Sequence, residues 1–199
     1  MRRAKPTDSK LDWQLLASSY DDQAGLILFE KRLDRLRNPR NGIEFERLVL
    51  ESVDWVNVVA IDKLQRCIMI RQYRFGVGYT TLETPGGMVD EGETSAQAAP
   101  RELLEETGYR AESWTYLGAV EPNPAIFDNL CHHWLATGCE RVNDQDMGDG
   151  ELISIELMSE AQVKAAVQGG ELRHALALSA LARVYRLWDY PCEMSNEED

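Results

Sequence analysis

Apolar and polar residues alternate with two different periods along this chain, and the change of period separates strands from helices. Three short runs before residue 52 have strand character, at residues 13–19, 25–31 and 45–51. Asp21-Asp22 and the segment 38–42, rich in Asn, Pro and Gly, break them. This stretch is too small for a core of its own. We therefore expect a short antiparallel sheet that packs on another surface.

The strongest strand pattern follows. Residues 55–61 (WVNVVAI) and 67–73 (CIMIRQY) are rich in β-branched side chains and flank a short polar turn. They predict a hairpin of two core strands. Further strands are expected at residues 114–120, 130–137 and 151–157. The acidic, glycine-rich stretch 138–150 predicts a long loop, and long loops in compact domains are often functional.

A helix is predicted between Thr94 and Gly108. Thr94 with Gln97 three residues later forms a capping-box start, and Gly108 suits the position after the last turn. Pro100 lies inside this segment, where proline removes a hydrogen bond. We therefore expect either a kink there or a regular helix that begins near Ala99.

Two more helices are predicted near the C-terminus. Ser159 with Gln162 gives a second capping box, and that helix should end near residues 169–170. A last helix is expected to reach about Trp188. It rests on one apolar stripe: Leu172, Leu176, Ala180, Val184 and Leu187. Strands and helices thus alternate in mixed order, which is typical of an α/β/α sandwich with a mixed sheet.

Composition excludes several classes of protein. The chain has 199 residues, 44% of them hydrophobic, which suits one well-cored domain. Its net charge of −13 argues against binding to a nucleic acid backbone. No apolar run is long enough to predict a membrane span or a secretory signal. The cysteines form no C-x-x-C pair, so we expect free thiols and a cytoplasmic location: Cys67, Cys131, Cys139 and Cys192.

Residues 87–109, GMVDEGETSAQAAPRELLEETGY, carry the candidate chemistry. On the predicted helix Glu102 and Glu106 share one face, and Glu105 lies beside them. Like charges at this spacing repel each other, so a partner should offset them. Mg²⁺ is commonly held by carboxylates together with substrate phosphates and water. The row therefore predicts half of a metal site, with a solvated acidic helix face as the alternative.

The spacing G-x5-E-x7-R-E-hydrophobic-x-E-E-x-G-hydrophobic resembles the Nudix box of the Nudix hydrolases, with Tyr109 at its last position. The resemblance implies a Nudix-type α/β/α sandwich over residues 53–190. A small N-terminal antiparallel β extension at residues 11–52 would precede it. Residues 1–10 are expected to be disordered, and residues 191–199 form an acidic tail. The resemblance also implies Mg²⁺ or Mn²⁺ as cofactor and attack of water on a diphosphate linkage.

The same resemblance assigns roles to single residues. It implies that the metal ligands are Gly86 (through its carbonyl), Glu102, Glu105, Glu106 and Glu151. Arg101 would orient a box glutamate, and Glu93 would support the loop before the helix. Arg101, Glu105, Glu106 and Glu151 would be the catalytic residues. The general base stays open among Glu140, Asp149, Glu151 and a box glutamate.

Residues 71–74 (RQYR), Glu83 and the turn at 85–87 resemble the ADP-ribose and nucleotide-sugar branch of the family. Strand alternation places Arg74 on the face opposite Arg71. Arg74 either holds a phosphate through its guanidinium fork or marks a strand end leaving the core. Pro124 is implied to contact substrate.

The aromatic and imidazole side chains after the box allow fewer assignments. Phe127 either stacks on a base or fills the core. His132 and His133 are adjacent on a strand, so they face opposite sides and are expected to be structural. His174 is expected to be exposed at the start of the last helix.

The expected activity is metal-dependent hydrolysis of the diphosphate in ADP-ribose or a nucleoside diphosphate sugar. The products would be a nucleoside monophosphate and a sugar phosphate. A homodimer that uses the N-terminal extension is implied by the resemblance. The alternatives are another Nudix substrate, such as an oxidised nucleoside triphosphate or a dinucleotide, a nonhydrolytic nucleotide-sensing module, an isopentenyl-diphosphate-isomerase-like enzyme, or removal of an RNA 5′ group.

Overall fold

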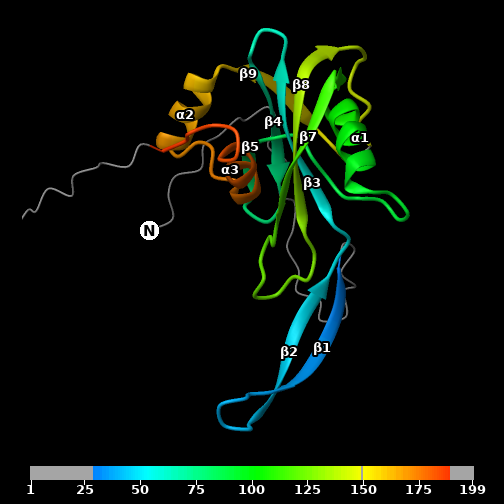
Figure 1. Cartoon of the computed structure of the whole chain (residues 1–199), viewed down its shortest axis with the longest axis vertical. Helices are drawn as coiled ribbons and strands as arrows, with labels where there is room; N and C mark the ends of the chain where they lie inside the picture. The colour runs from blue at the N-terminus through cyan, green and yellow to red at the C-terminus, as the bar shows by residue number, and fades with distance from the viewer. Residues whose placement is uncertain (1–28, 149, 189–199) are drawn as a thin grey trace, which may run out of the picture.

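A computed structural model describes residues 29–148 and 150–188. The predicted strand at 13–19, the N-terminal ten residues and the acidic tail lie outside the described residues, as does most of the predicted strand at 25–31. Residues 53–188 contain a mixed sheet with helices on both faces (Figure 1). The predicted α/β/α architecture is thus confirmed.

The main sheet has seven strands. At its centre β3 (Trp55–Asp62) runs parallel to β8 (Cys131–Arg141), and β7 (Ser113–Val120) lies antiparallel to β8. The short β6 (Tyr109–Arg110) pairs with the end of β8. On the other side β4 (Cys67–Arg74) pairs antiparallel with both β5 (Tyr79–Glu83) and β9 (Ile153–Met158).

The sheet opens between β3 and β4. These strands pair only near their connecting turn, at Ala60↔Ile68 and Ile61↔Cys67. Farther along, β5 takes the place of β3 beside β4. The segment that follows β5 then runs along β3, where Val58 N–H donates to the Pro85 carbonyl and Val56 N–H to the Gly87 carbonyl, both at 2.8 Å. A glycine pair is therefore placed in the opening of the sheet.

The helices cover the two faces of the sheet. α1 (Ser95–Thr107) lies on one face, whereas α2 (Glu160–Gln168) and α3 (Ala175–Leu181) lie on the other (Figure 1). Successive side chains of β3 point to opposite faces of the sheet and pack in both cores. Val58 belongs to the cluster that contains Leu103 of α1, and Val59 to the cluster that contains Leu181 of α3. Both valines are fully buried.

The capping signals were located correctly, whereas one of the two alternatives for the effect of Pro100 was wrong. Gln97 Oε1 accepts hydrogen bonds from the Thr94 N–H at 3.0 Å and from the Thr94 hydroxyl at 2.8 Å. The helix is assigned from Ser95 through Pro100 and does not begin near Ala99. Gly108 follows in the left-handed conformation, with φ 72°. α2 likewise has its capping box at Ser159 and Gln162.

Two other predictions were wrong. The last helix ends at Leu181, not near Trp188, and Leu187 reaches the core after a turn that is not helical. The predicted loop 138–150 is shorter at its start, because β8 continues to Arg141 where it pairs with β6.

The N-terminal strands form a two-stranded antiparallel hairpin, β1 (Glu30–Arg37) and β2 (Glu44–Glu51), joined by the predicted break at 38–42. β2 confirms the run predicted at 45–51, whereas β1 lies mostly beyond the predicted residues 25–31. The hairpin projects from the main body (Figure 1). Among the described residues, no helix has the length and apolar content needed to cross a membrane.

Candidate active site

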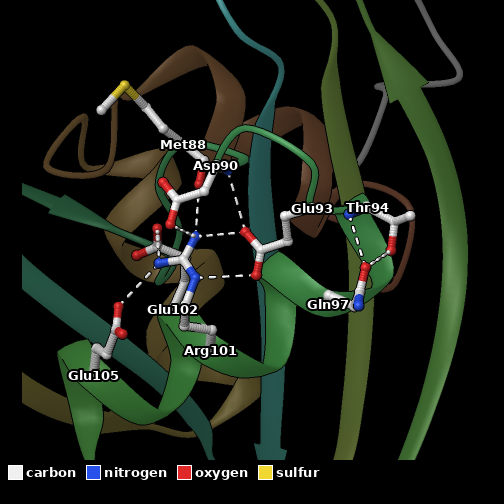
Figure 2. A network of polar contacts seen from close by, with 8 residues as sticks. All are labelled: Met88, Asp90, Glu93, Thr94, Gln97, Arg101, Glu102 and Glu105. Carbon is white, nitrogen blue, oxygen red and sulfur yellow. Dashed lines mark hydrogen bonds and ion pairs between the residues drawn. The ribbon is translucent and has the colours of Figure 1, made fainter.

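The Arg101 guanidinium makes polar contacts both with α1 and with the loop that precedes it. Its guanidinium donates to both carboxylate oxygens of Glu93, at 3.1 and 2.9 Å. It also donates to Glu102 and Glu105, both at 3.0 Å, and to the Met88 carbonyl at 2.9 Å (Figure 2). One arginine thus ties the loop before the helix to two glutamates of the helix.

Gly86 and Gly87 leave room for the carboxylates of Glu106 and Glu102 beside the backbone. Glu106 Oε2 accepts a hydrogen bond from the Gly86 N–H at 2.8 Å. A Cβ at Gly86 would overlap the Val56 carbonyl oxygen, and a Cβ at Gly87 would overlap the Glu102 carboxylate. The pairing of Pro85 and Gly87 with β3 leaves the Gly86 carbonyl unused by that strand. Any larger residue here would displace either β3 or a glutamate.

Burial sets the electrostatics of this pair. Burial, with further contributions from the charges of Glu105 and Glu151, raises the pKa of Glu102 to about 7, although Arg101 acts to lower it. Burial raises the pKa of Glu106 to about 8, with Glu102 and Glu151 again adding to it. The site thus concentrates negative charge in a place that solvates it poorly, which is the environment a divalent cation stabilises.

The donor set fits a hard divalent cation in type, because carboxylate oxygens are the ligands that Mg²⁺ and Mn²⁺ prefer. Within residues 29–148 and 150–188, however, no three acidic, histidine or cysteine side chains are already arranged around one point. Glu102 and Glu105 are turned toward Arg101 instead. Cation binding at this site would therefore involve reorientation of these side chains.

A second buried network joins β4, β5 and the start of α3. Arg74 donates from Nε and Nη2 to the two oxygens of Glu83, at 2.8 and 2.6 Å. Glu83 is 1% exposed. Burial alone would raise the pKa of Glu83, but the hydrogen bonds and charge of Arg74 outweigh it and lower that pKa.

His174 completes this network, contrary to the prediction that it is exposed. The residue caps α3, and its Nδ1 accepts from the Ala177 N–H at 3.4 Å. The proton therefore resides on Nε2, which faces Glu83 Oε2 at 3.6 Å. Sequence reasoning missed this contact because Glu83 and His174 are distant in sequence, and only the opening of the sheet brings them together.

Most of these groups border one cleft of about 900 Å³, although Glu93 and Glu83, the latter predicted to bind substrate, do not line it. The glutamates that line it are Glu102, Glu105, Glu106, Glu151 and Glu171. Arg74 and Arg101 also line it, with Gly86 and Gly87 between them. The structure thus brings together the residues predicted to hold metal and one of those predicted to hold substrate.

Three predicted candidates lie elsewhere. Pro124 is exposed and does not line the cleft. Phe127 packs against Phe29 and Trp55, with ring centroids 5.1 and 6.0 Å apart, behind the cleft wall that these two form. Glu140 is paired with Lys63 at 2.9 Å outside the cleft, so it does not serve as a base in this arrangement. Asp149 lies outside the described residues.

The NUDIX domain profile matches residues 53–178 of the chain. The chain belongs to the Nudix family. It is 31% identical over 160 residues to the ADP-ribose pyrophosphatase of Mycobacterium tuberculosis, covering 79% of this chain and 77% of that protein. The corresponding figures for the ADP-sugar pyrophosphatase of Mus musculus are 34% over 105 residues, 50% and 45%.

A solved structure shares the fold of this Nudix protein. The crystal structure of an ADP compounds hydrolase superposes with a TM-score of 0.70 at 26% identity, covering 81% of this chain and 86% of that one. Another relative, the ADP-ribose pyrophosphatase of Bacillus subtilis, is 34% identical over 96 residues, which span 48% of this chain and 52% of that protein.

Proposed function

We propose that this Nudix protein hydrolyses the diphosphate linkage of ADP-ribose or a nucleoside diphosphate sugar, giving a nucleoside monophosphate and a sugar phosphate. One observation carries the proposal: the four glutamates predicted to bind metal and the Arg74 guanidinium border the same cleft. Carboxylates and an arginine fork together suit a metal-bound diphosphate. The similarity to ADP-ribose and ADP-sugar pyrophosphatases supports it.

Mg²⁺ or Mn²⁺ is proposed as the cofactor, held by Glu102, Glu105, Glu106 and Glu151 with the Gly86 carbonyl. Bound there, it would neutralise diphosphate oxygens and lower the pKa of a water ligand. Arg101 holds Glu102 and Glu105 through hydrogen bonds in the structure, and these two side chains would turn from Arg101 toward the cation when it binds. Glu151 and the box glutamates, Glu102, Glu105 and Glu106, remain the candidate bases that line the cleft, since Glu140 is paired elsewhere.

Arg74 is proposed to hold the diphosphate. Its pairing with buried Glu83 fixes the guanidinium plane, so little side-chain freedom remains to be lost when substrate binds. The aromatic side chains of Phe29 and Trp55 line the cleft and offer apolar surface for the nucleobase. Pro124 and Phe127 would then act only indirectly, through the wall of this cleft or from a second copy of the chain.

A homodimer is proposed to form through the β1–β2 hairpin. In register, Leu33 pairs with Leu48 and Leu36 with Phe45, and these pairs lie on opposite faces. Leu33 and Leu36 are 69% and 53% exposed. A two-stranded hairpin with apolar side chains on both faces is marginal in water alone.

The buried free thiols of Cys67, Cys131 and Cys139 also suit the proposed cytoplasmic location.

The deciding experiment incubates the protein with Mg²⁺ or Mn²⁺ in ¹⁸O-labelled water. Substrates are ADP-ribose, ADP-glucose, UDP-glucose, GDP-mannose, NADH and 8-oxo-dGTP, with products identified by mass. Release of a nucleoside monophosphate from the sugar nucleotides supports the proposal, and the labelled product identifies the phosphorus attacked. Cleavage of 8-oxo-dGTP or NADH alone would favour another Nudix substrate. Tight binding without turnover would favour the sensing module.

A further inference from the structure

One end of the cleft carries a positive charge that no described residue neutralises. Three arginines line the cleft. Arg74 is paired with Glu83, and Arg101 with the glutamates around it. Arg173 makes no ion pair with any residue in 29–148 or 150–188; its guanidinium instead lies over the Tyr79 ring, 5.4 Å from the centroid. In a chain with a net charge of −13, an unpaired cleft arginine is unexpected.

The nearest acidic residue along the chain does not supply the missing partner. Glu171 also lines the cleft, but its carboxylate is held by Arg71 at 2.5 Å. The Arg173 Nε is buried without a hydrogen-bond partner among the described residues. Buried polar atoms are normally satisfied, so an unpaired donor on a residue that lines the cleft indicates a group that a ligand with acceptor oxygens could satisfy.

Arg173 lies at the part of the cleft formed by β4, β5 and the start of α3. Tyr79 pairs with Arg74 across β4 and β5, and Arg173 adjoins His174, which contacts Glu83. Phe29 and Trp55 lie on the β3 side of the cleft, with residues 85–87 between β3 and β5. A substrate whose base meets Phe29 and Trp55 would therefore extend its other half toward Arg173.

Resting on the proposed function, we infer that Arg173, supported by Tyr79, forms a subsite for an anionic group, phosphate or carboxylate, on the half of the substrate that is not the nucleotide. Arginine offers five donors and no acceptor, so its ligand must supply acceptor oxygens. The contact with the Tyr79 ring holds the guanidinium at the cleft, where its fork of donors can meet the oxygens of an anion. A neutral sugar would leave the charge of Arg173 without a partner.

Matched substrates test the subsite. The first pair is ADP-ribose and ADP-ribose with a phosphate on its terminal ribose; the second is UDP-glucose and UDP-glucuronate. We expect kcat/KM to be higher for the anionic member by about tenfold or more, the scale of a charged hydrogen bond. Arg173→Gln should remove the preference, so that the anionic and neutral members of each pair are cleaved with nearly equal kcat/KM. Arg173→Lys should keep part of it, and Arg110→Gln, which removes an exposed charge elsewhere, should keep all of it.

A binding measurement separates this inference from the proposed function. Calorimetry compares glucuronate 1-phosphate with glucose 1-phosphate, which needs no turnover. Cleavage of neutral and anionic substrates at equal rates, or a preference that survives Arg173→Gln, overturns the subsite and leaves the hydrolase. Absence of any cleavage, with selective binding of glucuronate 1-phosphate that Arg173→Gln abolishes, supports the subsite and overturns the hydrolase. Melting curves check that the variants fold.

Discussion

Arg74 and Glu83 face each other across β4 and β5, with Nη2 and Nε of the arginine 2.6 and 2.8 Å from the two carboxylate oxygens. Glu83 is almost fully buried, whereas the Arg74 side chain is 41% exposed. The pair is thus anchored at the carboxylate end and open to the cleft at the guanidinium end. This asymmetry makes Glu83 a support and Arg74 the group that meets substrate.

Replacing Arg74 with alanine should therefore affect both stability and binding. The unpaired buried Glu83 should lower the free energy of unfolding by about 3 kcal/mol. KM should rise more than kcat falls if Arg74 only holds phosphate. Arg66→Ala is the matched control, because it likewise takes an arginine from a buried carboxylate, that of Asp62, but neither residue lines the cleft, so KM should be nearly unchanged. Equal losses in kcat and kcat/KM for Arg74→Ala would instead indicate transition-state stabilisation.

Glu106→Gln should separate catalysis from folding. The amide keeps an oxygen for the Gly86 N–H but removes a buried charge that Glu102 and Glu151 repel. We expect kcat to fall by about a thousandfold or more through loss of a metal ligand. In EDTA the variant should melt at or above the wild-type temperature. Glu105→Gln should also lose activity, whereas the exposed Glu91→Gln is the control. Near-wild-type turnover of both variants would remove the metal-site argument.

The sequence predicted the α1 side of the site well because its signals are local. Capping residues, helical spacing and the following glycine all lie within one segment, so Glu102 and Glu106 could be placed on one face without knowledge of the fold. Glu140 shows the opposite case. It was expected in a loop, but pairing of β6 with the end of β8 extends the strand there, and that pairing is nonlocal.

The α3 side was predicted less well for the same reason. The apolar stripe through Val184 and Leu187 implied a helix, yet both positions contact the core after the helix has ended. Arg183 lies within this turn and donates to the Leu117 and Ala119 carbonyls of β7. His174 reaches Glu83 only because β3 and β4 separate. The end of α3 and the contact between His174 and Glu83 depend on tertiary contacts, which the pattern of residues within one segment does not predict.

The hairpin offers a test of the proposed dimer. Leu36→Ser with Phe45→Ser should convert the protein from dimer to monomer in light scattering, because it removes the apolar pair from one hairpin face. Leu64→Ser is the control, since Leu64 is 72% exposed in the turn between β3 and β4. A wild-type protein that is monomeric at high concentration, or a double variant that stays dimeric, would contradict this role of the hairpin.

His133 should make stability depend on pH. It is fully buried, and both ring nitrogens lack hydrogen-bond partners among the described residues. Burial, together with the charges of Arg183 and His132, lowers the pKa of His133 to about 4. The unfolded chain, with an ordinary histidine pKa of about 6.5, therefore binds more protons between these values. Stability from this residue is complete above about pH 6.5 and is lost as the pH falls toward 4, by up to about 3 kcal/mol.

His133→Leu removes the titrating group and keeps an apolar side chain in the core. Urea unfolding at pH 7 and pH 4.5 should show a smaller loss of unfolding free energy for the variant than for the wild type. Val58→Ala serves as the control, because it should lower stability at both pH values without changing their difference. Other carboxylates contribute equally to all three proteins and cancel in the comparison. Parallel pH curves for the wild type and His133→Leu would show that His133 is protonated without cost, and that its burial does not set the acid limit of the fold.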